Sequence, residues 1–267
     1  MTDRRRFALR RWRRVRAETV AAGTAFLRRR TAVFFTFFFP AIVILIFGAL
    51  VQTAGSGGLF TEPPGYYVPG YLAVVVLFTP LSRVGSEVAR HRADSRFEKL
   101  ATTPLRRWEW LLGQTLVNVG VIGVASAGIL LLAVVVAGAS VVLSPLLVPY
   151  VALGVALFCG VGALLGRVAD SQDGVVAAAN GVALPLLFLS ETFVPPSLLP
   201  DWLPLWLSPL TYFSRGVRAA TYRPPGTIAT ARVPGGGLAP SEANLVVLAA
   251  LAVVAFVVGA VSVPRTD

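Results

Sequence analysis

The sequence has almost none of the side chains that bind metals or act as nucleophiles: its 267 residues include one cysteine and one histidine. Cys159 alone cannot close an internal disulfide or build a thiolate metal site, and His91 has no second imidazole for a zinc site or a proton relay. Only 14% of the residues are charged, against about 25% in soluble globular domains. These shortages exclude most hydrolase and metalloenzyme chemistry and argue against a soluble enzyme.

Apolar residues are abundant, at 55% of the chain, and the net charge of +11 comes almost entirely from arginine, since Lys99 is the only lysine. Such a composition cannot cover a soluble domain with polar surface. The sequence also contains no Gly-rich phosphate-binding loop ending in Gly-Lys-Ser/Thr, no His-Glu-x-x-His and no Gly-x-Ser-x-Gly. It therefore predicts an integral membrane protein that is not an enzyme and binds no nucleotide, metal or other cofactor itself.

Six apolar stretches are long enough, or nearly so, to cross the roughly 30 Å hydrocarbon core of a bilayer as helices. The second stretch is shorter than the others, and Pro69 and Pro80 weaken its helical pattern. The sequence thus predicts an all-α protein with one transmembrane domain over residues 31–263 and a short tail at 264–267. Its spans are expected at about 31–52, 66–81, 111–137, 146–166, 174–194 and 243–263.

The distribution of arginine predicts the topology. Eleven arginines lie in residues 1–30 and seven basic residues lie in the connection 83–110, whereas the connections 53–65 and 138–145 contain none. The positive-inside rule places both termini and these basic segments in the cytoplasm of a plasma-membrane protein. The connection 195–242 is then outside although it holds four arginines, which is acceptable because long loops translocate largely regardless of charge.

The first 30 residues have a helical pattern of their own. Apolar side chains recur at steps compatible with one helix face, and arginines fill much of the rest; these apolar residues are Leu9, Trp12, Val15, Ala22 and Phe26. This pattern predicts an interfacial helix whose guanidinium groups contact lipid phosphate. A nucleic-acid-binding arm is the competing interpretation, and the neighbouring membrane spans argue against it, so the expected partner is the lipid bilayer and not nucleic acid.

The outer segment 191–213 contains five prolines and several aromatic residues, which favour the membrane–water boundary. It predicts short re-entrant or interfacial helices between the fifth and sixth spans, followed by an external loop at 223–240. Polar residues within the spans are candidates for the transport pathway. Asn118 and Asn180 are expected to form hydrogen bonds between helices, and Glu191 is a candidate for an outer gate.

The connection 83–110 is too long and too patterned for a simple turn. Its first part can extend the second span as a charged helix, and Pro104 then breaks the helix. Thr103 could cap the helix that follows. The result would be a projecting elbow that presents Phe97, Leu100 and Leu105 beside charged residues; a solvated loop is the alternative interpretation.

At these residues the sequence resembles the permease subunits of type-2 ABC exporters. The family's elbow pattern is matched by Glu98, Leu100, Thr103, Pro104, Leu105 and Glu109, with Gly113 beyond it. The family's opening to the second span is matched by residues 69–72, and its proline-rich outer segment is matched by Pro195, Leu199, Pro200, Trp202, Leu203, Pro209, Leu210, Tyr212 and Arg218. Two positions depart from the family pattern: Ser95-Arg96 replaces a Gly-Thr pair, and Glu191 replaces a glycine.

The resemblance implies a permease that pairs as a homodimer or heterodimer and docks two separate ATP-binding subunits, in which ATP and Mg bind. Coupling to those subunits would fall to Arg92, Phe97, Glu98, Leu100, Thr103, Pro104, Leu105, Arg106 and Glu109. The pathway would lie between the two copies, lined by the second and fifth spans, and its candidate pathway or outer-gate residues are Asn180, Glu191, Trp202, Trp206 and Tyr212. The alternatives are an ATP-independent secondary transporter or channel, and a non-transporting membrane scaffold.

Overall fold

The computed structural model describes residues 2–46, 63–193, 199–200, 202–223 and 239–264, and these residues form helices joined by turns, with no strand among them. The predicted all-α architecture is therefore confirmed. The helices are α1 (Thr2–Arg28), α2 (Arg30–Ile44), α3 (Pro64–Ala93), α4 (Arg96–Ala101), α5 (Arg107–Val135), α6 (Leu147–Val168), α7 (Gln172–Phe188), η3 (Leu205–Leu207), α8 (Pro209–Thr221) and α9 (Pro240–Ser262).

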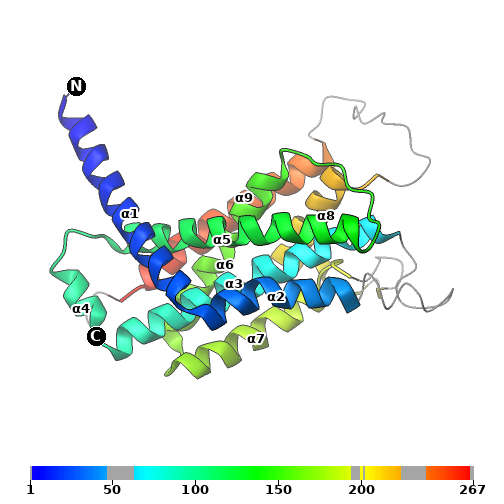
Figure 1. The fold of residues 1–267 in the computed structure, drawn as a ribbon. Helices are drawn as coiled ribbons and strands as arrows, with labels where there is room; N and C mark the ends of the chain where they lie inside the picture. The colour runs from blue at the N-terminus through cyan, green and yellow to red at the C-terminus, as the bar shows by residue number, and fades with distance from the viewer. Residues whose placement is uncertain (1, 47–62, 194–198, 201, 224–238, 265–267) are drawn as a thin grey trace.

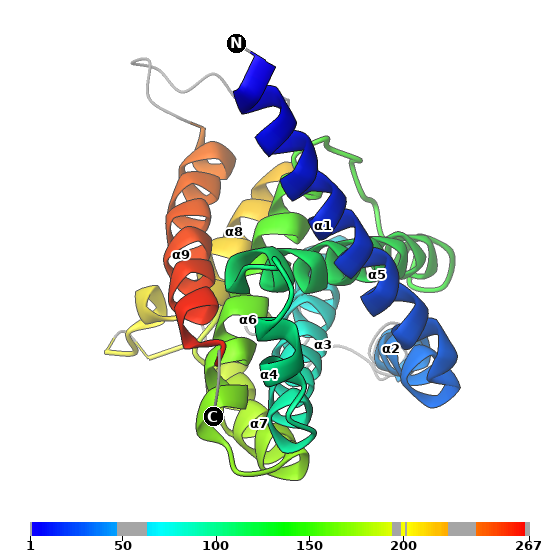
Figure 2. The ribbon, with the colours of Figure 1, turned by 90° about the vertical axis from the view of Figure 1, so that its left-hand side faces the viewer.

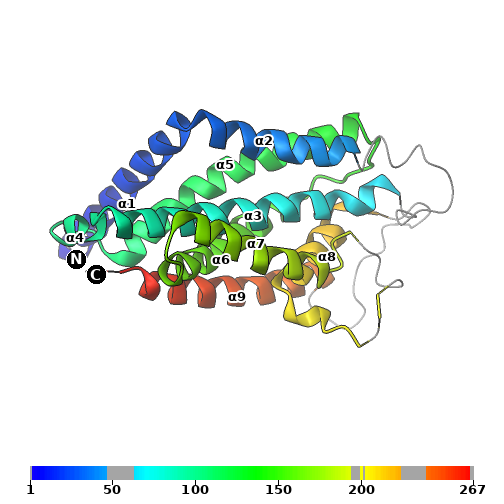
Figure 3. The same ribbon diagram turned by 90° about the horizontal axis from the view of Figure 1, so that it is seen from below.

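The long helices run side by side along one axis, and the short helices lie at the two ends (Figure 1). The short helix α4, the start of α5 and the end of α9 lie together at one end, here named the elbow end (Figures 1 and 3). Helix α8 lies at the opposite end. Helix α1 leaves the bundle at an angle and crosses α5, as the view along the bundle shows (Figure 2).

Among the described residues, four helices are long and apolar enough to cross a membrane: α3, α5, α6 and α9. Helix α7 is apolar but has 17 residues, and the described part of α2 has 15. The expected fifth span reaches residue 194, yet α7 ends at Phe188, because the chain then turns so that Glu191 can contact α8. The end of the expected first span at 47–52, Val194, most of the predicted external loop and residues 265–267 lie outside the described part of the chain. The count of six spans stays a prediction.

The second span is longer than its sequence indicated. Helix α3 continues through Pro69 and Pro80 and ends only at Ala93, so it includes the charged extension that the sequence predicted. Membrane helices tolerate proline because their neighbours can satisfy the carbonyl groups it frees. Every residue from Pro64 to Arg92 is buried or half-buried, since α5, α6, α7 and α8 all pack against α3.

Glycines of α6 allow α3 to approach closely. A Cβ atom built on Gly162 would lie 2.6 Å from the backbone oxygen of Leu81, and one on Gly166 would lie 2.3 Å from that of Gly85. The Gly162–Gly166 pair, one helical turn apart, therefore packs α6 directly onto the backbone of α3, as small-xxx-small pairs do in membrane helices.

The first helix uses only part of its predicted apolar face. Val15, Ala22 and Phe26 are buried against the bundle, whereas Leu9 and Trp12 are 59% and 61% exposed. Leu9 and Trp12 lie in the N-terminal part of α1, which leaves the bundle, so they have no neighbouring helix to pack against (Figures 1 and 2). Only the part of the predicted face nearer the end of α1 is therefore buried.

Candidate functional site

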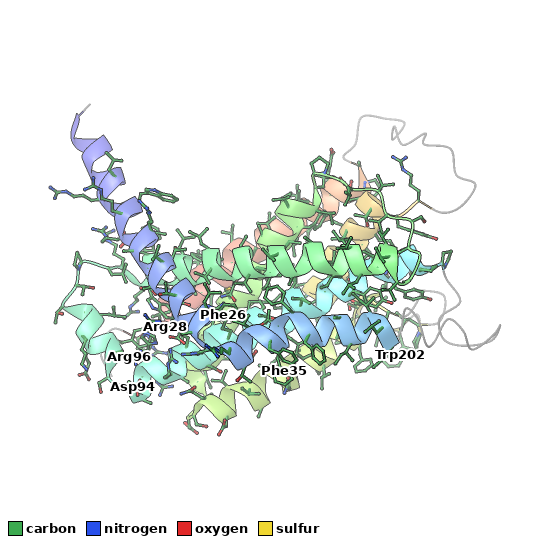
Figure 4. The ribbon with its side chains drawn as sticks, in the orientation of Figure 1. Phe26, Arg28, Phe35, Asp94, Arg96 and Trp202 are labelled. Carbon is green, nitrogen blue, oxygen red and sulfur yellow. The ribbon has the colours of Figure 1, made fainter. Side chains whose placement is uncertain are left out.

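The elbow connects α3 to α5 through the short helix α4. Ser95 makes the turn into α4 with φ of +50°, and it is the one residue other than glycine with positive φ in the described chain. Left-handed backbone favours glycine, because a Cβ atom crowds the following carbonyl oxygen. Ser95 stands where the family pattern that the sequence resembles has glycine, which has no Cβ atom to crowd such a turn. Asp94 and Arg96, which flank the turn, form an ion pair of 3.2 Å and lie at the elbow end (Figure 4).

Helix α4 has an inner and an outer face. Phe97 is 5% exposed and packs against Trp110 and His91, with ring centroids 5.5 Å and 5.2 Å away. Glu98 and Lys99 lie on the exposed side. The expectation that Phe97 is presented at the surface was therefore wrong, because its ring fixes α4 to the bundle.

The helix that follows the elbow is not capped by Thr103. The Thr103 hydroxyl donates to the Leu100 carbonyl at 2.7 Å and so closes the end of α4. Helix α5 begins instead at Arg107, and the Glu109 carboxylate accepts a hydrogen bond of 3.0 Å from the Arg106 backbone N–H. A carboxylate in the first turn is favourable at the positive end of the helix dipole.

Glu109 joins the elbow to α1. Its side chain is fully buried, and both of its oxygens accept hydrogen bonds from the Arg14 guanidinium, at 3.0 Å and 2.7 Å. These hydrogen bonds raise the pKa of Arg14 above its ordinary value. Two parallel bonds between guanidinium and carboxylate define the orientation of both groups. Glu109 is therefore unavailable to a partner protein and instead holds α1 against α5.

A second polar contact between α1 and α5 lies one turn further along. Glu18 accepts a hydrogen bond of 3.0 Å from the buried amide of Gln114. Burial raises the pKa of Glu18, which indicates that its charged form is poorly solvated. Next to it, Asn118 accepts from Arg83 of α3 at 3.3 Å, which confirms Asn118 as a hydrogen-bond partner between helices.

Three arginines bind the ends of other helices at the elbow end. Arg92 donates to the backbone oxygens of Gly166, Arg167 and Ala169 at the end of α6, at 2.7–3.3 Å. Two more donate to the end of α9, Arg107 to Val261 at 2.9 Å and Arg167 to Ser262 at 3.1 Å. Cations at a helix C-terminus satisfy its free carbonyls and favour its dipole. Arg92, expected to contact an ATP-binding subunit, thus ties α3 to α6.

At the opposite end, Glu191 is buried and forms an ion pair with Arg215 of α8, with one hydrogen bond of 2.8 Å to the arginine Nε. Arg218 donates to the Glu191 carbonyl at 2.7 Å and stacks over the Tyr66 ring, 4.0 Å from its centroid. Glu191, the candidate for an outer gate, thus connects the segment that follows α7 to α8. The sequence shows these three residues, but it does not show that α8 folds back to bring them together.

The remaining candidates for the outer gate do not gather at one place. Trp202 and Trp206 are 80% and 69% exposed, and Trp202 lies far from the elbow (Figure 4). Tyr212 donates to the Trp206 carbonyl at 3.1 Å. Asn180 is exposed on the side of α7 that faces away from α3, and it has no hydrogen-bond partner among the described residues. Within the described part of the chain, Asn180 therefore does not pair with another helix.

The fold is that of a multi-pass helical membrane protein with a projecting elbow at the basic end of its bundle. Residues 15–222 match the ABC-2 type transporter family, which covers most of the chain from α1 to the end of α8. No curated protein matches the sequence significantly. The chain belongs to the ABC-2 type transporter family and is a transport permease rather than an enzyme.

Proposed function

We propose that this permease is the membrane subunit of an ATP-driven exporter in the plasma membrane, with six spans and both termini in the cytoplasm. It would work as a dimer of two permease chains, and two separate ATP-binding subunits would hold ATP and Mg. The observation that carries the proposal is the elbow, which combines an exposed outer face with a base bonded to α1, α6 and α9.

The outer face of α4 is the proposed docking surface. Glu98 is exposed and forms no ion pair with any described residue, so its carboxylate is available to a cation of a partner. Lys99 lies beside it and offers the opposite charge. Exposed charges of this kind direct partner choice and association rate more than they add affinity.

The base of the elbow would transmit a displacement of α4 to the bundle. The Glu109–Arg14 pair carries movement to α1, and Arg92 and Arg107 carry it to the ends of α6 and α9. A ligand shifts a conformational equilibrium only through contacts that differ between the two states. In this proposal ATP binding changes the contacts on the outer face of α4, and the arginine contacts move the helix ends together.

The exposed side of α7 is the proposed boundary of the pathway between the two copies. Most of the surface of α3 is covered within one chain. On α7, by contrast, Asn180 and its neighbours are exposed. A polar side chain without a partner is unfavourable against lipid. Asn180 would therefore face the second copy or the passing substrate.

Two isosteric substitutions separate docking from transmission. Glu98→Gln should weaken recovery of a P-loop ATPase when the permease is purified from crosslinked membranes in mild detergent. Glu109→Gln should retain the ATPase but lose the increase in hydrolysis that the permease produces, because a neutral amide cannot hold Arg14 as a carboxylate does.

The control is Glu242→Gln at the opposite end, which also removes one exposed carboxylate and should change neither readout. Recovery of no P-loop ATPase with the wild-type chain would contradict the proposal and favour an ATP-independent transporter or a scaffold. Unchanged docking and hydrolysis in both elbow variants would remove the elbow from the mechanism.

A further inference from the structure

A cavity of about 350 Å³ lies beneath the elbow, on the side of α4 that faces the bundle. Its walls come from the inner face of α4, the turn at 103–106, the first turn of α5 and the end of α9. Apolar side chains and two arginines line it, and no acidic side chain does; the principal lining residues are Phe97, Leu100, Leu105, Arg106, Trp110 and Val263. Its volume falls in the range of about 300–1,000 Å³ typical of small-molecule sites.

One lining side chain has a hydrogen-bond donor that no described residue satisfies. Trp110 is 2% exposed, and its indole N–H is buried without an acceptor. A buried donor left unpaired costs about 1–3 kcal/mol. The indole is therefore a donor at the cavity wall that an acceptor from another molecule could satisfy.

The charge of the cavity identifies the kind of acceptor. Helix α5 begins at Arg107, which lines the cavity, so the positive end of the helix dipole lies at the cavity wall. Arg106 also lines the cavity and has an exposed side chain. The carboxylate in this first turn, Glu109, is bound by Arg14 and is not part of the lining. An anion is thus favoured over a neutral acceptor.

The surface beside the cavity indicates that the anion carries an apolar chain. Val263, the residue that follows α9, lines the cavity, and α9 is the least buried of the four long apolar helices. Its last turns present an exposed aliphatic strip that leads away from the cavity towards the middle of the bundle, formed by Val253, Val254, Val257, Val258 and Val261. A molecule with an anionic head in the cavity could lay a hydrocarbon chain along this strip.

We propose that the cavity beneath the elbow binds an anionic phospholipid, with its phosphate at Trp110, Arg106 and the first turn of α5 and an acyl chain along α9. Basic pockets between membrane helices are suited to such headgroups. An acidic side chain of a partner protein would also bind the hydrogen-bond donors of the cavity, but it would not cover the exposed aliphatic strip of α9. The proposal does not depend on the docking of an ATP-binding subunit.

The test is native mass spectrometry of the delipidated full-length permease, titrated with phosphatidylglycerol and separately with phosphatidylcholine. The wild-type chain should retain phosphatidylglycerol preferentially. Trp110→Phe keeps an aromatic ring but removes the N–H together with the rest of the five-membered ring, and Arg106→Gln removes an exposed charge without disturbing the core. Each should weaken retention of phosphatidylglycerol about tenfold, the effect of one hydrogen bond to a charged group.

Matched controls lie at the opposite end. Trp202→Phe and Arg223→Gln make the same chemical changes at exposed positions and should leave retention at the wild-type level, including the background from the arginines of α1. Inorganic phosphate should not displace the lipid, and displacement by phosphate alone would reduce the site to a simple anion site and contradict the role of α9. Equal retention of both lipids, or wild-type retention in both cavity variants, would overturn the proposal. Loss of ATPase binding with unchanged lipid retention would assign the cavity to the protein partner instead.

Discussion

The substitution Gly166→Ala tests whether the bundle depends on the direct contact between α6 and α3. The added methyl would lie 2.3 Å from the Gly85 backbone oxygen and 2.7 Å from the Val88 Cβ, whereas ordinary contacts begin near 3.4 Å. The helices must therefore separate locally by about 1 Å, since the obstacle is backbone and cannot change rotamer. Overpacking costs about 1–3 kcal/mol, and a backbone obstacle places this case near about 3 kcal/mol.

The protein contains its own reporter for this measurement. Cys159 is the only cysteine and is fully buried on α6, so a thiol-reactive fluorescent dye reports unfolding as the protein is heated in detergent. A loss of about 3 kcal/mol corresponds to a Tm lower by about 6–12 °C for a chain of this size.

Gly123→Ala is the matched control, because a Cβ at Gly123 of α5 meets no atom within 4 Å. Its Tm should equal the wild-type value or exceed it slightly, since alanine favours the helix more than glycine does. If the Gly166→Ala variant had the same Tm as the Gly123→Ala control, the close packing of α3 and α6 would be refuted.

Three further sets of substitutions test the contacts of α1, the elbow and α8. Glu18→Gln keeps an oxygen that accepts from Gln114 and should raise Tm at pH 7. Burial raises the pKa of Glu18, so the folded state favours the protonated acid. The gain in Tm over wild type should therefore shrink as pH falls through that raised pKa towards the ordinary carboxyl value. A gain that stays constant with pH would contradict the burial of this charge. Ser95→Gly should stabilise the elbow by about 1 kcal/mol, measured as slower proteolysis between α3 and α5, whereas Ser95→Ala should not. Arg215→Gln should leave Glu191 buried without its charge partner and lower Tm, and a second substitution, Glu191→Gln, should restore much of the loss because the double variant buries no unpaired charge.

The sequence was sufficient to place most helices but not their ends. Apolar length locates α5, α6 and α9 to within a few residues, because that property depends on the segment alone. The true lengths of α3 and α7 depend on neighbours. Helix α3 continues through two prolines inside a packed bundle, and α7 stops where Glu191 turns to meet Arg215.

The elbow was predictable as a feature, whereas the roles of its side chains were not. Pro104 and the charged pattern mark a break and a short helix, and both are present. Glu109 was assigned to partner binding because its pattern position cannot reveal that Arg14, 95 residues earlier, folds against it. The sequence also could not show the orientation of Phe97, because an aromatic residue among charged neighbours gives the same sequence pattern whether its ring points into the bundle or towards solvent.

The structure also gives a second reason for the position of the arginines. Helices α3, α6 and α9 all end at the elbow end, where their free carbonyls form the negative ends of three dipoles. Arg92, Arg107 and Arg167 are bonded to the carbonyls of α6 and α9, so these charges serve helix ends as well as topology. The arginines at the opposite end also have partners: Arg215 is paired with Glu191, and Arg218 donates to the Glu191 carbonyl and stacks over the Tyr66 ring. Both arginines lie in a connection predicted to be outside the membrane, where the positive-inside rule expects few basic residues. Because both are engaged in contacts within the fold, they count less against the predicted topology than two free arginines would.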